Sequence, residues 1–188
     1  MGKLLIKNAT VINEGNRLEE DVLIEGEVIS SVSKNIQIDS DTEVIDADGL
    51  ILIPGMIDDQ VHFREPGLTH KGNISSESKA AIAGGVTSYI EMPNTSPNTT
   101  TIEELNKKIN IASIDSYSNF SFMFGGTNDN LEEIKKIDPT EVAGIKLFLG
   151  SSTGKMLIDN LNSIEKIFSS TSLPISAHCE DEQTIKNN

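Results

Sequence analysis

The chain has 188 residues and a formal net charge of −14. That acidity excludes a surface for nucleic acid or acidic lipid, because phosphate binding needs clustered lysine and arginine. No apolar run approaches the roughly 18–20 residues of a membrane span, and the apolar start, Met1–Lys7, is too short for a secretory signal. The single cysteine, Cys179, excludes an internal disulfide and indicates a cytoplasmic protein.

Residues 1–53 consist of short segments rich in Val, Ile and Leu, separated by turn residues such as Asn13-Glu14-Gly15-Asn16. Segments this closely spaced leave no room for helices, so residues 1–53 are expected to form a small all-β, sandwich-like unit. Its strands are expected over 3–7, 10–12, 21–25, 27–32, 43–45 and 50–53.

Residues 54–188 show a different sequence pattern, in which segments typical of strands alternate with segments typical of helices. Such alternation predicts βαβ units and a parallel sheet. The apolar run 50–57 is expected to be a buried strand entering that sheet, and Gly150–Lys155 a flexible loop at the rim. The strand pattern after Pro54-Gly55 covers 56–62, and the other strands are expected over 86–92, 120–124, 142–149 and 174–178. The helices are expected over 75–83, 101–111, 131–136 and 161–168.

Most of these strands carry polar or unusual residues at or near their ends, namely His62 with Arg64, Asn94, Lys146 and His178. In a parallel barrel the catalytic and binding residues lie at the carboxyl ends of the strands, so the pattern predicts an α/β fold of the TIM-type (β/α)8 class. Such a barrel needs about 250 residues. Residues 54–188 are therefore expected to supply its N-terminal half, about the first five strands, and the chain to be a fragment.

The first strand end combines a metal ligand with an anion-binding group. Side chains alternate along a strand, so Gln60, His62 and Arg64 would share one face while the chain stays extended. An imidazole beside a guanidinium is the layout of a metal site that holds a negatively charged substrate.

Several segments along the chain form a recognisable set of motifs: Val44–Gly49, Pro54–Asp58, His62–Gly67, Ala83–Thr87, Met92–Thr95, Gly144–Phe148 and Ser176–Glu180. Together they resemble the dihydroorotases, a family in the cyclic-amide branch of the amidohydrolases. Arg64 and the Pro93-Asn94-Thr95 turn narrow the resemblance to this family, because allantoinases usually carry Asn at the arginine's place and hydantoinases lack the Arg-Glu-Pro-Gly run.

The resemblance implies a zinc enzyme of pyrimidine biosynthesis that interconverts L-dihydroorotate and N-carbamoyl-L-aspartate, with one or two zinc ions. His62 matches the second histidine of the family's His-x-His pair, His178 a ligand at the fifth strand, and Lys146 the lysine that carbon dioxide converts to a bridging carbamate. Arg64 and Asn94 match the residues that bind the substrate's carboxylate and ring.

Two departures from the family pattern stand out. Gln60 occupies the place of the first histidine of the pair, and a neutral amide is a poor zinc ligand, so a single-metal site becomes an alternative. The family's catalytic aspartate and its remaining metal histidine belong to strands beyond residue 188. The fragment alone is therefore expected to be inactive.

Plainer roles remain open for each candidate: a core histidine for His62 or His178, a lysine reaching the sheet edge for Lys146, an ion pair with Glu65 for Arg64, and a turn residue for Asn94. Cys179 is expected to be a small buried thiol. Two other functions also remain open, a related hydantoinase- or allantoinase-like cyclic-amide hydrolase, and a non-catalytic subunit that scaffolds aspartate carbamoyltransferase. The expected partners are a carboxylate-bearing cyclic amide and either further copies of the chain or that transferase.

Overall fold

The computed structural model describes residues 2–150, 156–180 and 182–188. Its contacts divide the chain into two compact units, Met1–Pro54 and Gly55–Asn188. Most of the loop expected at Gly150–Lys155 lies outside the described residues.

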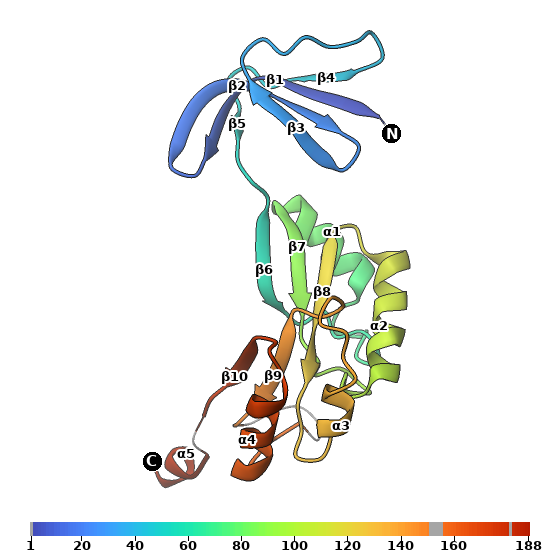
Figure 1. Cartoon of the computed structure of the whole chain (residues 1–188), viewed down its shortest axis with the longest axis vertical. Coiled ribbons are helices and arrows are strands. Elements are labelled where there is room, and N and C mark those ends of the chain that lie inside the picture. Colours follow the sequence, from blue (N-terminus) through green and yellow to red (C-terminus); the bar gives the residue numbers. More distant parts are fainter. Residues whose placement is uncertain (1, 151–155, 181) are drawn as a thin grey trace. The chain divides into compact units, whose positions relative to one another are not determined.

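The first unit is a five-stranded mixed sheet in the order β3-β2-β1-β4, with β5 also paired to β1 (Figure 1). Its small core contains Leu5, Ala9, Val22 and Ala47. The hairpin between the first two strands turns at Glu14 and Gly15, which both have positive φ, as a tight two-residue turn requires. The strands are β1 (Lys3–Asn13), β2 (Asn16–Glu25), β3 (Val28–Ser33), β4 (Glu43–Asp46) and β5 (Ile51–Leu52).

The strands expected over 3–7 and 10–12 are one continuous strand, β1, with a bulge between Ile6 and Ala9. Asn8 lies in the bulge with φ +62. The buried carboxylate of Asp21 accepts the backbone N–H of Asn8 at 2.9 Å and that of Ile36 at 3.1 Å. A side chain therefore replaces the strand pairing that the bulge interrupts.

The second unit contains a parallel five-stranded sheet in the order β10-β9-β8-β7-β6 (Figure 1). Strand order follows chain order, and helices separate the strands, so the predicted half of a (β/α)8 barrel is confirmed. The strands are β6 (Met56–Val61), β7 (Val86–Glu91), β8 (Asn119–Gly125), β9 (Gly144–Phe148) and β10 (Ile175–His178). The helices are α1 (Ile74–Ala83), α2 (Ile102–Asp115), α3 (Leu131–Ile134), α4 (Leu161–Ser170) and α5 (Glu182–Asn187).

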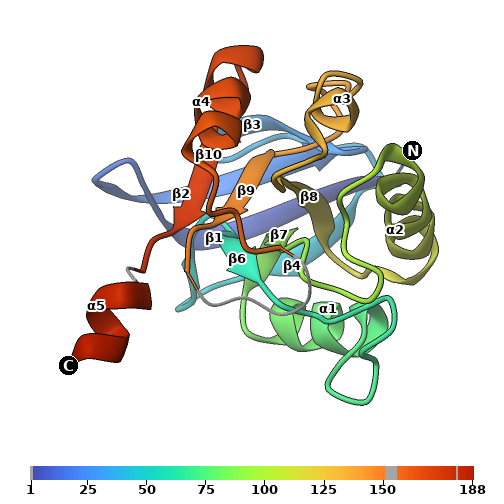
Figure 2. The same cartoon turned by 90° about the horizontal axis from the view of Figure 1, so that it is seen from below.

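Helices α1 to α4 lie along the outer side of the curled sheet (Figure 2). Between sheet and helices lies a core of aromatic and aliphatic side chains, which includes Tyr89, Phe122 and Leu105, each no more than 1% exposed. The helices begin where capping residues stand: Asn73 accepts the Ser76 N–H at 2.8 Å, and Thr101 accepts the Glu104 N–H at 3.2 Å.

The expectation of one buried strand over 50–57 is wrong. Ile51–Leu52 pairs with β1 in the first unit, and the parallel sheet begins only at Met56. Met56 and Ile57 are 63% and 67% exposed, because β6 is an edge strand that pairs with β7 alone.

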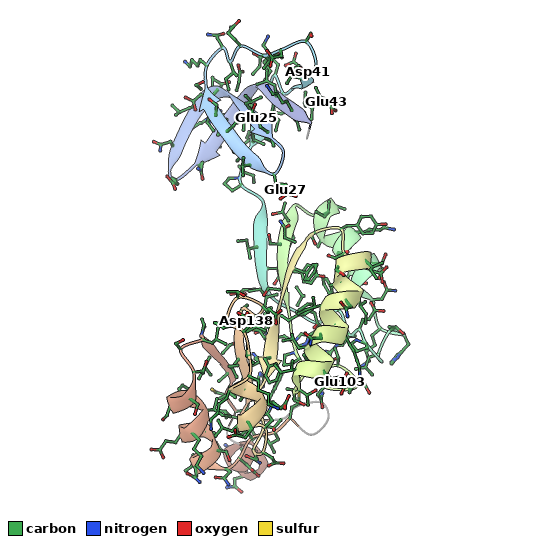
Figure 3. All side chains as sticks on the ribbon, turned by 45° about the vertical axis from the view of Figure 1, so that its right-hand side comes forward. Glu25, Glu27, Asp41, Glu43, Glu103 and Asp138 are labelled. Atoms are coloured by element: carbon green, nitrogen blue, oxygen red, sulfur yellow. The ribbon has the colours of Figure 1, made fainter. Side chains whose placement is uncertain are left out.

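Acidic residues account for the strong negative charge, and many lie at the surface. Figure 3 labels six of them, including Glu25 and Asp41 in the first unit and Glu103 on α2. Among the residues that the structure describes, no helix has the length and apolar character needed to cross a membrane.

Candidate active site at the carboxyl ends of the parallel strands

His62 and Asn94 come together from two neighbouring strands. His62 follows β6 and Asn94 follows β7, and His62 Nδ1 lies 2.8 Å from Asn94 Oδ1. An amide oxygen only accepts hydrogen bonds, so Nδ1 carries the hydrogen and Nε2 keeps its lone pair. This is the tautomer in which a second side chain orients a metal-binding imidazole. Asn94 therefore has a contact that the sequence did not reveal.

The loop that carries Asn94 is held by its own backbone. Pro93 O accepts the N–H groups of both Thr95 and Thr99 at 2.9 Å, and Met92 N–H donates to Val61 O at 3.0 Å. Asn94 itself is only 6% exposed. The side-chain amide is thus fixed beside the end of β6 before any ligand arrives.

Strand alternation was expected to place Arg64 on the same face as Gln60 and His62 as long as the chain stays extended. Strand β6 ends at Val61 and Arg64 has φ +71, so the alternation does not continue to Arg64. A positive φ is uncommon for a residue with a side chain and is typical of functional sites. Its guanidinium lies near enough to His62 to lower the pKa of that imidazole.

The neighbouring Glu65 does not pair with Arg64. Its Oε2 accepts the Ile74 N–H at 2.8 Å, at the start of α1. Among the described residues, no carboxylate forms an ion pair with Arg64, so the guanidinium is available for a ligand.

The two loops that carry Arg64 and Asn94 touch through their backbones. Ser96 N–H donates to Pro66 O at 3.1 Å. Gly67 has φ +81, and a Cβ placed on it would lie 1.8 Å from Ser96 O. Only glycine fits this contact, which holds the two loops side by side.

Lys146 lies in the middle of β9 and is only 3% exposed. Its Nζ donates to Gln60 Oε1 at 3.3 Å, so the structure brings these two predicted residues together. Desolvation lowers the pKa of the Lys146 amine, and among the described residues no carboxylate compensates its charge. The buried amine of Lys146 thus contacts an amide on the edge strand β6.

His178 ends β10, where it pairs in register with Phe148, two residues beyond Lys146 on the neighbouring strand. Its Nε2 lies 3.3 Å from Glu180 Oε1, and its ring stands 6.3 Å from the Phe148 ring. The next residue, Cys179, is exposed, so the expectation of a buried thiol is wrong. The short β10 is an edge strand of this sheet and pairs with β9.

The pKa of His62 is lower than usual. Partial desolvation of the imidazole is the main cause, the hydrogen bond with Asn94 opposes it, and the charges of Arg64, Lys146 and Lys108 lower the pKa further. A lowered pKa keeps the imidazole neutral at pH 7, the form in which it can bind a metal.

The predicted residues fit a zinc ion only if Lys146 is not a protonated amine. Zinc accepts imidazole nitrogens, so His62 and His178 are suitable ligands, whereas an ammonium at Lys146 would repel it. In the described part of the chain, no three His, Cys, Asp or Glu side chains form a metal-binding group. A sufficient donor set would therefore need an anionic ligand at Lys146, such as its carbamate, and the desolvation that lowers the pKa of this amine favours the free amine from which a carbamate forms.

Two further residues, Glu91 and Lys108, were missed by the sequence reasoning. Glu91 ends β7, Lys108 lies on α2, and they form an ion pair that is almost completely buried. A signal was present, since Lys108 falls on the same helical stripe as the buried residues Leu105 and Ala112.

A sizeable cavity lies elsewhere in this unit. It has a volume of about 810 Å³ and lies between the start of α2 and the loop after β8, where Glu103, Asp129 and Leu157 are among its lining residues. None of the predicted site residues lines it. The predicted residues instead lie on the open side of a half-barrel.

A curled parallel sheet with outer helices, and with imidazoles, a lysine and an arginine at its strand ends, defines a barrel of the amidohydrolase type. The chain belongs to the dihydro-orotase-like family, whose model matches residues 49–188.

Curated relatives and solved structures agree with this family. The chain is 35% identical over 192 residues to the dihydroorotase of Methanosphaera stadtmanae, covering 100% of this chain and 42% of that protein. It is 51% identical over 96 residues to the dihydroorotase of Carboxydothermus hydrogenoformans, covering 50% of this chain and 22% of that one. The L-hydantoinase (dihydropyrimidinase) of Arthrobacter aurescens superposes with a TM-score of 0.91 at 28% identity, covering 100% of this chain and 43% of that one. The chain thus spans less than half the length of these relatives.

Proposed function

We propose that this chain is part of a zinc-dependent dihydroorotase, which reversibly hydrolyses L-dihydroorotate to N-carbamoyl-L-aspartate in pyrimidine biosynthesis. The observation that carries the proposal is the unpaired Arg64 guanidinium beside the hydrogen-bonded pair of His62 and Asn94. The names of the relatives support a cyclic-amide hydrolase. Arg64 supports a cyclic-amide substrate whose ring bears a carboxylate.

Arg64 is proposed to bind the substrate's carboxylate. A planar guanidinium presents two parallel N–H donors to a carboxylate, which an ammonium cannot do. Because Asn94 Oδ1 accepts from His62, its Nδ2 remains to donate to an acceptor on the substrate. The two contacts together would fix the ring's orientation at the ends of β6 and β7.

The residues proposed to hold zinc are His62, His178 and Lys146 as its carbamate, with Gln60 as a doubtful fourth. Zinc, when bound, lowers the pKa of a bound water toward neutrality and polarises the amide carbonyl. Asn94 keeps the His62 imidazole in the orientation and tautomer that a metal ligand needs. The lowered pKa of Lys146 increases the fraction of free amine, which is the form that combines with carbon dioxide.

Two observations favour alternative functions. The hydantoinase neighbours favour a cyclic-amide hydrolase for a ring without a carboxylate. Gln60, in the place of a metal ligand, favours a non-catalytic subunit that associates with a transferase.

One experiment separates these functions. Zinc per chain is measured on the full-length protein, supplied with bicarbonate, and hydrolysis of L-dihydroorotate is compared with that of dihydrouracil, which differs only in lacking the carboxylate. Zinc with a strong preference for dihydroorotate supports the proposal. Zinc with a preference for dihydrouracil indicates the hydantoinase-like function, and neither zinc nor hydrolysis indicates the scaffold.

A further inference from the structure

Glu91 and Lys108 form the most deeply buried ion pair in the described part of the chain. Lys108 is 0% exposed and Glu91 is 1% exposed, whereas the other described ion pairs have side chains at or near the surface. Removing two charges from water is costly, and a well-packed apolar pair of the same volume is often as stable or more stable. The fold alone therefore gives no reason for this pair.

Lys108 forms a hydrogen bond at each end of the loop that carries Asn94. Its Nζ donates to Met92 O, just before the loop, at 2.9 Å, and to Thr99 Oγ1, just after it, at 3.4 Å. One ammonium on α2 thus joins the two ends of the 93–98 loop. That loop places the Asn94 amide 2.8 Å from the imidazole of His62.

Glu91 faces the other loop. Burial raises the pKa of its carboxyl, and three groups oppose that rise: the charge of Lys108, the backbone N–H of Arg64 and the guanidinium of Arg64. The Arg64 N–H approaches the carboxylate without the geometry of a standard hydrogen bond. The strand register pairs Glu91 with Val61, three residues before the left-handed backbone at Arg64, so this carboxylate lies beside the start of the loop that carries Arg64.

We propose that Glu91 and Lys108 are a positioning pair that holds the Arg64 and Asn94 loops at the spacing required by a carboxylate-bearing cyclic amide. The proposal rests on the proposed function, since it assigns both loops to substrate binding. Neither member of the pair touches the substrate. Each acts through a loop, Lys108 on Asn94 and Glu91 on Arg64.

The test uses the full-length protein and a variant in which both charges are removed together. Glu91→Gln/Lys108→Met keeps the volume of both side chains and leaves no uncompensated buried charge. We expect a thermal midpoint close to that of the parent protein, a kcat within about threefold, and a KM for dihydroorotate raised at least tenfold. A pair that only supported the fold would change the midpoint and the active fraction but leave KM unaltered.

The matched control is Lys107→Met on the same helix, which removes an exposed ion pair with Glu103 and Glu104 and should leave KM unchanged. If the double variant does not fold, Thr99→Val tests the proposal instead, because it removes only the hydroxyl that joins Lys108 to the loop. We expect it to raise KM severalfold at an unchanged midpoint, with Thr100→Val as its control. An unaltered KM in whichever variant folds would overturn the proposal.

The parent protein separates this proposal from the function on which it rests. If the parent hydrolyses dihydroorotate, the comparison of KM values tests the positioning pair alone. If the parent prefers another cyclic amide, the proposed function fails, and the same comparison with that substrate still tests whether the pair sets the loop spacing.

Discussion

The Nζ of Lys146, on β9, donates a hydrogen bond to the side-chain amide oxygen Oε1 of Gln60, near the end of β6, at 3.3 Å. A histidine in place of Gln60 would offer an imidazole nitrogen at the same point. In the proposed zinc site, the two residues would jointly decide how much metal is bound, Gln60 by its side-chain type and Lys146 by its carboxylation.

The first prediction concerns Gln60. We expect Gln60→His to tighten zinc binding at least tenfold, because a direct imidazole ligand should be worth no less than the second-shell partners that change metal affinity about 10–100-fold. Zinc dissociation constants and zinc per chain, measured with bicarbonate present, check this. The control is Gln37→His, an exposed position in the first unit. An unchanged dissociation constant would exclude residue 60 from the metal site.

A second prediction concerns Arg64. Arg64→Lys keeps the charge but loses the paired donors, and Arg64→Met loses both. Hydrogen bonds to charged groups contribute about 1.5–3 kcal/mol, so we expect Arg64→Met to lower kcat/KM for dihydroorotate roughly 10–150-fold. Arg64→Lys should recover only part of this loss.

Dihydrouracil provides the internal comparison for Arg64, since it has no carboxylate for the guanidinium to bind. Arg17→Lys, at the exposed start of β2, is the matched control substitution. Equal losses for both substrates in Arg64→Met would show that Arg64 supports the loop and not the carboxylate.

The third prediction is an alkaline loss of stability at Tyr89. Burial raises the pKa of its phenol to about 12 from the usual 10. The phenol must stay protonated in the folded state, so its contribution is fully present below pH 10 and is lost as the pH rises toward 12. The free energy of unfolding should fall by about 1.4 kcal/mol per pH unit in that window.

Tyr89→Phe should remove this pH dependence, and the difference between parent and variant cancels the other groups that titrate at high pH. Urea unfolding at pH 9 and pH 11 measures it. Tyr117→Phe removes a phenol that is 58% exposed and serves as the control. If parent and Tyr89→Phe lose stability in parallel between the two pH values, the buried phenol is not responsible.

A fourth prediction concerns the contact between the two loops that carry Arg64 and Asn94. Gly67→Ala adds a Cβ that would meet Ser96 O at 1.8 Å, whereas Gly15 has a similar positive φ, +78, with no neighbour within 4 Å. Both substitutions cost roughly 1–2 kcal/mol for the left-handed backbone. Gly67→Ala should cost about 1–3 kcal/mol more, for the overpacking alone.

Gly67→Ala should also raise the KM for dihydroorotate, because the loops must separate to admit the methyl group. Gly15→Ala should leave KM as it is. Equal losses of unfolding free energy in the two variants would show that the Gly67 loop moves away from Ser96 without strain.

Much of the fold could be predicted because its signals are local. The alternation of strand and helix patterns along residues 54–188 was enough to predict the parallel sheet. The exposed Met56 could not be predicted, because an apolar edge strand has the same composition as a central one. The continuous β1 was also missed, since the Asp21 carboxylate that supports its bulge lies far along the chain.

The candidate site was predictable in its residue types but not in its contacts. The family resemblance supplied the residues to consider, whereas the hydrogen bond from His62 to Asn94 joins positions 32 residues apart. The left-handed backbone at Arg64 left no trace in the sequence around it. Lys108 could have been found by helical periodicity, but its partner Glu91 is known only once α2 packs on the sheet.

The capping bond from Glu65 to α1 has a consequence for inhibition. A carboxylate one residue from Arg64 would be present at a very high effective concentration and would compete with any acidic substrate for the guanidinium. The N–H of Ile74 instead donates a hydrogen bond to the Glu65 carboxylate, at the positive end of a helix. The start of α1 thereby keeps a tethered competitor away from the arginine.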